Sequence, residues 1–178
     1  MHEPDPATIR AAAAGDEAAF AELVRAYQAQ VWRFLRHMLG DPQLAEDVAQ
    51  ETFIRVHRRL RQFRFRSKFS TWLYAVARNA GVDAIRARRR RAALAERAAP
   101  ARAGVPGGEL RVELDAALQS LPARLREAFL LIEVLGFRYR EAGTVLGVPE
   151  GTVKSRVFYA REHLVAWLEA GEEAADEL

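Results

Sequence analysis

The sequence predicts an all-α protein in which two small helical domains are joined by a flexible linker. Apolar residues recur at intervals of three and four along most of the chain, which is the spacing of one face of an α-helix. Alternating runs of Val, Ile and Thr between turn residues, which would indicate strands, are absent. The stretch 92–109 is rich in Ala, Pro and Gly and poor in large apolar side chains, as expected of a linker.

Three helices are expected before this linker. The first carries an apolar face from Phe20 onward and ends at Gly40, because glycine favours the left-handed backbone of a helix C-cap. Asp41 follows as the N-cap of the second helix, since its carboxylate can accept from free N–H groups of the first turn. The third helix is expected to begin around Ser70 or Thr71.

The second domain is expected to contain a helix-turn-helix motif between Tyr139 and Leu164. A short helical pattern is followed by a tight turn, Gly147-Val148-Pro149, and by a longer helix whose core stripe includes Val153 and Val157. The face opposite this stripe would meet base edges in the major groove, and its flanks would meet phosphates. A plain helical hairpin is the alternative interpretation.

The domain boundaries follow from these patterns. We expect the first domain at 1–91, the linker at 92–109, the second domain at 110–170 and an acidic tail at 171–178. With 178 residues the chain is long enough for one large core or two small ones.

Positive charge is concentrated between Arg55 and Arg91. This segment holds 12 Arg and one Lys but a single acid, a net charge of +12 in a chain whose total is +3. It also contains five aromatic side chains: Phe63, Phe65, Phe69, Trp72 and Tyr74. Cations follow phosphates while aromatic faces stack on unpaired bases, so the combination favours a single nucleic-acid strand. A solvated basic face over an ordinary aromatic core is the alternative.

Several other functions are disfavoured by the sequence. The chain has no cysteine, and its four histidines are scattered, so no metal site or cofactor is expected. The segment GVPEGTVKS lacks the spacing of a phosphate-binding loop, and we expect no enzymatic activity. No signal peptide or apolar run long enough to cross a bilayer is present, so we expect a cytoplasmic protein that does not insert into the membrane.

Three segments resemble the two domains of bacterial sigma factors. They are DPQLAEDVAQETFIRVHRRL, FRSKFSTWLYAVARNAGVDAIRARRRR and LPARLREAFLLIEVLGFRYREAGTVLGVPEGTVKSRVFYAREHL. Their order is similar to that of the extracytoplasmic-function (ECF) class of the sigma-70 family, which keeps sigma region 2, sigma region 4 and little else. The resemblance covers about Phe20 to Leu168.

The resemblance implies a transcription initiation factor that binds core RNA polymerase through its largest and second-largest subunits. It also implies binding to promoter DNA, both duplex and single-stranded, by −35 duplex readout and −10 strand capture. An anti-sigma factor is a further candidate partner. The alternative is a helix-turn-helix DNA-binding transcriptional regulator that does not act as a sigma factor.

Site residues carry over from the family in three sets. The expected core polymerase-binding residues are Asp47, Gln50, Glu51 and Phe53. The expected −10 binding and melting residues are Arg61, Phe63, Arg64, Phe65, Arg66, Lys68, Phe69, Trp72, Asn79, Asp83 and Arg86. The expected −35 residues are Thr152, Lys154, Ser155, Arg156, Phe158, Tyr159 and Arg161. Spacing alone would make Asp47 and Glu51 a solvated acidic pair. For Trp72, the alternative is a core residue.

Two features depart from the family pattern. Ala142 and Gly143 stand where the family usually has a bulky aliphatic residue followed by alanine. A glycine inside a helix costs about 1 kcal/mol relative to alanine, so a less stable domain is expected, although small residues also allow close helix crossing. Tyr159 stands where basic residues are frequent in the family, so the sequence does not indicate which promoter is recognised.

Overall fold

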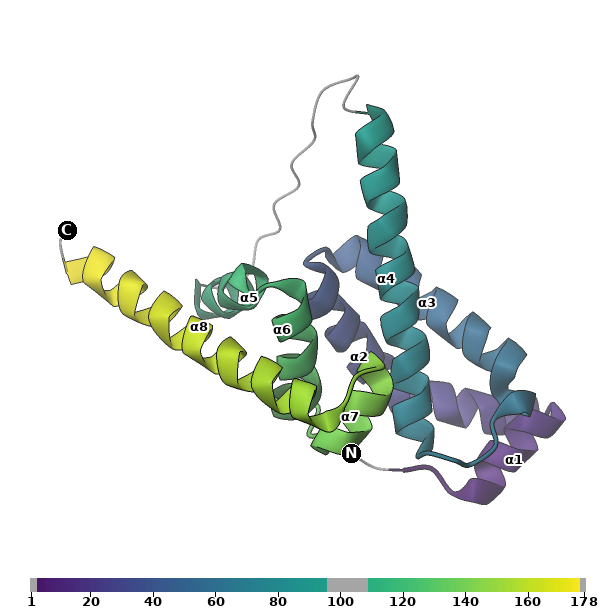
Figure 1. The fold of residues 1–178 in the computed structure, drawn as a ribbon. Helices are drawn as coiled ribbons and strands as arrows, with labels where there is room; N and C mark the ends of the chain where they lie inside the picture. Colours follow the sequence, from purple (N-terminus) through teal and green to yellow (C-terminus); the bar gives the residue numbers. More distant parts are fainter. Residues whose placement is uncertain (1–2, 96–108, 177–178) are drawn as a thin grey trace.

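The computed structural model describes residues 3–95 and 109–176, and it confirms the all-α fold (Figure 1). Most of the expected linker, residues 96–108, lies outside the described residues, as does the end of the expected acidic tail. The described helices are α1 (Pro6–Ala14), α2 (Glu17–Leu39), α3 (Pro42–Arg59), η1 (Leu60–Gln62), α4 (Phe69–Ala95), α5 (Glu109–Ser120), α6 (Ala123–Phe129), the π-helical turn η2 (Leu130–Val134), α7 (Tyr139–Leu146) and α8 (Glu150–Asp176).

Aspartates set the starts of the first three helices. The carboxylates of Asp5, Asp16 and Asp41 accept hydrogen bonds of 2.7–3.0 Å from backbone N–H groups in the first turns of α1, α2 and α3. Gly40 ends α2 at φ 68°, as the sequence predicts. Helix α1 is an addition to the expected pattern. It packs on α2 and buries Ile9.

Helices α2, α3 and α4 form the bundle of the first domain. The predicted apolar face of α2 is confirmed, since its side chains are buried at Leu23, Tyr27, Val31, Phe34, Leu35 and Met38. Helix α4 begins one residue before the expected start, at Phe69, and both Ser70 and Thr71 are buried. These two hydroxyl residues therefore lie inside the helix and do not cap it.

The second domain differs from the expected pattern in one helix. The helical spacing of Leu125, Phe129, Ile132 and Leu135 after Pro122 predicts that they form the inner face of a helix, but these side chains are only partly buried. Leu130 and Leu131 are more deeply buried instead. The Leu135 N–H donates to the Leu130 carbonyl, an i→i+5 bond that widens this turn and rotates the following side chains away from a regular helical register.

The helix-turn-helix motif is formed by α7 and α8. Gly147 ends α7 in the left-handed conformation at φ 68°, and Val153 and Val157 of α8 are buried as predicted. A Cβ atom on Gly143 would lie 2.8 Å from the carbonyl oxygen of Val148. The glycine that departs from the family pattern therefore lets the turn pack directly against α7.

The two domains pack against each other along α4. Figure 1 shows α7 beside the N-terminal half of α4, while α8 extends away from it. The ring of Tyr74 meets that of Phe137 edge-to-face at 5.3 Å, and Arg78 forms an ion pair of 3.0 Å with Glu127. The described residues of both domains thus share one continuous core.

Gly143→Ala is expected to destabilise the protein by about 1–3 kcal/mol, because the added methyl group meets backbone that cannot move without displacing the turn. Urea denaturation followed by circular dichroism measures the change. Gly151→Ala is the matched control: nothing lies within 4 Å of its added Cβ. The control should leave the free energy of unfolding unchanged or raise it by up to about 1 kcal/mol. An equal change in the free energy of unfolding for both substitutions would contradict a close contact between position 143 and the Val148 carbonyl oxygen.

Candidate nucleic-acid interface

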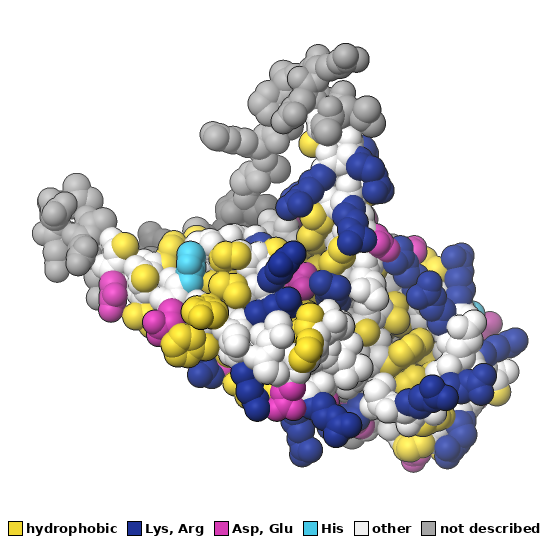
Figure 2. All heavy atoms as spheres, viewed as in Figure 1, with side chains coloured by type: hydrophobic (Ala, Val, Ile, Leu, Met, Phe, Trp, Pro, Cys, Tyr) yellow, Lys and Arg dark blue, Asp and Glu magenta, His cyan; other side chains and the backbone are white. Residues whose placement is uncertain are grey.

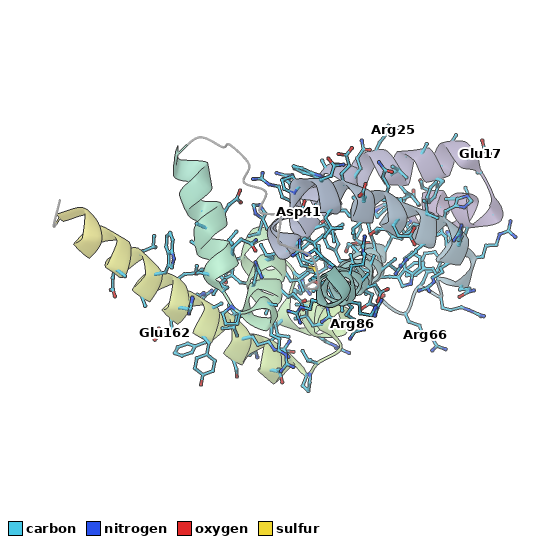
Figure 3. The ribbon with its side chains drawn as sticks, turned by 90° about the horizontal axis from the view of Figure 1, so that it is seen from above. Glu17, Arg25, Asp41, Arg66, Arg86 and Glu162 are labelled. Atoms are coloured by element: carbon cyan, nitrogen blue, oxygen red, sulfur yellow. The ribbon has the colours of Figure 1, made fainter. Side chains whose placement is uncertain are left out.

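The loop between η1 and α4, residues 63–68, carries exposed cations around an aromatic cluster. Arg64, Arg66 and Lys68 are exposed, and Arg66 extends away from the helices while Arg86 lies on α4 (Figure 3). The ring of Phe63 lies 4.8 Å from that of Phe65 and 5.3 Å from that of Trp72. The loop thus offers half-buried rings with guanidinium groups at their edges.

A hollow of about 210 Å³ opens on one side of this loop. Its lining residues come from the loop, from the turn before it and from the first turn of α4: Gln62, Phe63, Arg64, Arg66, Ser67 and Trp72. Phe63 and Trp72 supply aromatic faces, and two arginines supply positive charge. A planar base with its phosphate matches this chemistry, because rings stack on base faces and guanidinium groups bind phosphate oxygens.

Phe65 has an unusual backbone conformation. Its φ of 53° lies in the left-handed region, which bulky side chains rarely adopt. The Arg10 guanidinium of α1 lies 5.8 Å from the centre of the Phe65 ring, within the range of a cation–π contact. Helix α1 therefore contributes to the loop, a role that the sequence patterns do not indicate.

The predicted −10 residues of α4 divide between surface and core. Asn79, Asp83 and Arg86 are exposed, whereas Phe69 is only 2% exposed and packs on Phe63 and Trp72. Figure 2 shows basic side chains gathered along the upper part of α4 and over the side of the first domain. Phe69 supports the rings of the loop from beneath and does not reach the surface.

Asp83 is held by an arginine that also binds a predicted core-binding residue. Arg55 donates to Glu51 on its own helix and to Asp83 on α4, both at 2.8 Å. The hydrogen bond with Glu51 and then that with Asp83 raise the pKa of the Arg55 guanidinium. One side chain therefore links residues that the sequence assigns to two different surfaces.

A second hollow, of about 570 Å³, lies between α2 and α3. Its lining is mainly apolar and includes two of the predicted core-binding residues; it consists of Val24, Gln28, Ala29, Trp32, Glu46, Ala49, Gln50, Phe53 and Ile54. Ile54 is 45% exposed there and adds to the apolar surface of the hollow. Asp47 is exposed on α3 but does not line this hollow, and Glu51 is engaged by Arg55.

The exposed face of α8 agrees with the predicted rotation of the helix. Lys154, Ser155, Phe158, Tyr159 and Arg161 are exposed, and Thr152 and Arg156 are half-buried. Exposed hydrophobic side chains form a patch over α8 in Figure 2, and the large exposed hydrophobic residues of this helix are Phe158, Tyr159, Val165 and Leu168.

Two of the exposed cations on α8 are paired within the protein. Lys154 forms an ion pair of 2.8 Å with Glu150, and Arg161 one of 2.5 Å with Glu133. The hydrogen bond with the carboxylate raises the pKa of each cation. Both side chains are at the protein surface, where such pairs are weak and exchange readily for other anions.

Loop 63–68 and the helix-turn-helix motif meet in an ion pair. Lys68 Nζ lies 2.8 Å from Glu141 Oε1, and the other oxygen of Glu141 accepts a hydrogen bond from the Arg138 N–H. Burial alone would raise the pKa of Glu141, but the hydrogen bonds from Lys68 and Arg138 outweigh it, so that this pKa is lowered.

Among the described residues, no cluster of three or more His, Asp or Glu side chains could hold a metal ion. Nor is any described helix long and apolar enough to cross a membrane.

A helix-turn-helix domain packed on a helical domain with a basic, aromatic loop defines a DNA-binding transcription protein. Comparison with known families makes this specific: residues 23–91 match Sigma-70 region 2, and residues 111–164 match Sigma-70, region 4. The chain belongs to the sigma-70 family of RNA polymerase sigma factors, in the ECF class. It is a transcription initiation factor that binds RNA polymerase.

Relatives match over most of their length. The RNA polymerase sigma-H factor of Pseudomonas aeruginosa is 36% identical over 177 residues, which covers 90% of this chain and 91% of that protein. SigC of Mycobacterium tuberculosis is 38% identical, covering 87% and 86%, and SigW of Bacillus subtilis is 32% identical, covering 84% and 89%. These relatives are sigma factors, which are not enzymes.

Two solved structures share the fold. The sigma factor RpoE in complex with the anti-sigma factor NepR from Bartonella quintana is 26% identical, with a TM-score of 0.76 over 84% of this chain and 96% of that one. CnrH in complex with the cytosolic domain of CnrY is 25% identical, with a TM-score of 0.75 over 92% and 96%.

The lowered pKa of Glu141 predicts a pH-dependent stability. Because its pKa is lower in the folded state, the ionised group stabilises the protein above its unfolded-state pKa of about 4.3, and this contribution is lost as the pH falls through the folded-state pKa. Glu141→Gln should therefore unfold more easily than wild type at pH 7, by up to about 1 kcal/mol. Urea denaturation at pH 7 and at successively lower pH should show the difference shrinking, and a constant difference would contradict the assignment.

Proposed function

We propose that this protein directs core RNA polymerase to specific promoters by capturing an unpaired −10 strand and reading a duplex −35 element. The observation that carries the proposal is the hollow beside loop 63–68. Its aromatic walls suit a base that has left the stack, and its arginines suit the attached phosphates. Duplex DNA hides its base faces, so a site of this kind favours strands that are already open.

Readout of −35 is assigned to α8. Its exposed residues stand opposite the buried stripe, so this face can enter a major groove while the stripe stays packed. Lys154 and Tyr159 are the proposed base contacts, and Arg156 and Arg161 the proposed phosphate contacts. On DNA, Arg161 would exchange its carboxylate partner for a phosphate oxygen.

Binding of core polymerase is assigned to the apolar hollow between α2 and α3. Gln50 and Phe53 line it, and Trp32 and Ile54 extend the apolar surface beyond the residues that the sequence predicts. We propose that the largest subunit of the polymerase binds at this hollow. The protein would act together with the polymerase in the cytoplasm. Asp47 and Glu51 would lie at the edge of this contact. An anti-sigma factor is proposed as a regulator, supported by the complex of the Bartonella quintana relative with NepR.

Binding to both promoter elements requires the two domains to move apart. Elements at −35 and −10 are separated by roughly 25 base pairs, or about 85 Å along a duplex at about 3.4 Å per pair. Lys68 of the capture loop and Glu141 of the helix-turn-helix motif are 2.8 Å apart at their charged atoms. The packed arrangement therefore corresponds to a protein that is not engaged with both elements.

Ile54→Asp is expected to weaken binding to bacterial core RNA polymerase by roughly tenfold, because a charge would enter the apolar contact. Fluorescence anisotropy of the labelled protein titrated with core enzyme measures the affinity. Gln43→Asp is the matched control: it adds the same charge to an exposed position of the same helix, outside the hollow. Equal affinities of the two folded variants would exclude the hollow as the polymerase site.

Tyr159→Ala and Arg156→Ala should affect −35 binding differently. Loss of a base contact should cost about 1–3 kcal/mol and relax the preference at particular −35 positions. Loss of a phosphate contact should weaken all sequences alike and reduce the salt slope by about 1. Selection from a promoter library randomised at −35, with salt titrations of the reconstituted holoenzyme, measures both. An unchanged preference with Tyr159→Ala and an altered one with Arg156→Ala would mean that α8 lies on the groove in a different rotation.

A further inference from the structure

The residues before α1 make a long-range contact with the start of α4. The carboxylate of Glu3 accepts hydrogen bonds from the backbone N–H groups of Phe69 at 3.0 Å and Ser70 at 3.3 Å. These are N–H groups of the first turn of α4, which have no acceptor within their own helix. Glu3 is therefore the cap of a helix that begins 66 residues later.

Helix α4 lacks a local side chain suited to this role. The residue before its first turn is Lys68, whose ammonium group is a donor only and cannot accept from the helix N–H groups. Ser70, which could act as a cap at another position, is buried inside the helix. The last residues of loop 63–68 and the first turn of α4 are thus fixed by the carboxylate of Glu3.

The strap formed by residues 3–6 is itself held in place. Asp5 caps α1 through the Ala7 N–H at 2.7 Å, and Ile9 of α1 is buried in the core of the first domain. The segment that carries Glu3 is therefore anchored next to the start of α4.

Loop 63–68 lines two separate hollows. Besides the 210 Å³ hollow at Phe63 and Trp72, it contributes to a third hollow of about 770 Å³, which is also lined by residues of the strap, α1 and α2. Phe65 and Ser67 face this space, and Phe65 has the strained φ of 53°. A strained backbone persists only where neighbouring groups fix it. Two contacts from the N-terminal residues are placed to do so: the Glu3 cap and the Arg10 guanidinium over Phe65.

We propose that Glu3 is a positioning residue for −10 strand capture. Its carboxylate holds the start of α4, and through it loop 63–68, in the conformation that keeps the Phe63 and Trp72 rings open to a base. Glu3 acts through the backbone of Phe69 and Ser70 and does not touch DNA. The proposal rests on the proposed function of this loop and adds the N-terminal strap as a second element of the capture site.

The experiment measures binding of an unpaired −10 strand by the holoenzyme reconstituted from bacterial core RNA polymerase. The probe is a promoter fork with a duplex upstream part and a single-stranded −10 segment carrying 2-aminopurine, whose fluorescence reports base capture. Glu3→Ala removes the acceptor and should weaken capture about fivefold, the effect of losing a helix cap. Glu3→Gln keeps an amide oxygen as acceptor and should retain part of the affinity. Affinities for core polymerase and for a duplex −35 fragment should not change.

Glu22→Ala is the matched control. Glu22 lines the same hollow as Glu3. The carboxylate that accepts hydrogen bonds from the N–H groups of Phe69 and Ser70, however, is that of Glu3. This variant should capture the strand as wild type does. Equal capture by Glu3→Ala, Glu22→Ala and wild type would overturn the proposal. Tighter capture by Glu3→Ala would also overturn it, because it would mean that Glu3 competes with a DNA phosphate for the start of α4.

Phe63→Ala separates this inference from the proposed function. If Phe63→Ala weakens capture and Glu3→Ala does not, the loop captures the strand and Glu3 has no positioning role. If Phe63→Ala leaves capture unchanged, the assignment of the loop itself is wrong, and the inference fails with it. Should Glu3→Ala fail to fold, as shown by circular dichroism, the milder Glu3→Gln decides the question on the same assay.

Discussion

The packing of Tyr74 is the constraint on which the rest of the structure depends. Its ring is fully buried and meets Phe34 of α2 and Phe137 of the second domain, both edge-to-face, at 5.4 Å and 5.3 Å. One side chain therefore belongs to the core of the first domain and to its contact with the second. Burial raises the pKa of its hydroxyl, which has no hydrogen-bond partner among the described atoms. Such an unsatisfied group is a cost that the surrounding apolar packing must offset.

Helix α4 combines this packing with the chemistry of the surface. Its buried side is fixed by Tyr74 and by its neighbours on α2, so Asn79, Asp83 and Arg86 can only face outward. Its first turn follows directly on loop 63–68, and its arginines continue the positive surface along the helix. Because the same rigid element carries all of these groups, their relative positions do not depend on any long loop.

The local rules of helix formation could be read from the sequence, and the long-range contacts could not. Gly40 and Asp41 were predicted as cap residues because each acts on residues beside it in the chain, and the buried stripe of α8 followed from its regular spacing. Glu3 caps α4 across 66 residues, and Lys68 pairs with Glu141, so neither contact leaves a signal in a local window.

The other departures have local causes. Helix α1 is rich in alanine, so its two faces differ little in hydrophobicity. The π-helical turn at Leu130–Val134 breaks the helical spacing from which the inner face after Pro122 was predicted. At the candidate site, Phe63 and Trp72 were predicted and do line the hollow, whereas Ile54 and Arg10 gave no signal that separates them from ordinary helix residues.

The contact between the domains has a consequence for how strongly different promoters are occupied. If only separated domains can engage both elements, the apparent dissociation constant for every promoter is the intrinsic value divided by the separated fraction. The Tyr74–Phe137 and Arg78–Glu127 contacts lower that fraction equally for all sequences. Ratios between promoters then stay the same, but the protein concentration needed to fill a weak site rises in proportion. At a fixed protein concentration, only the best-matched promoters remain well occupied.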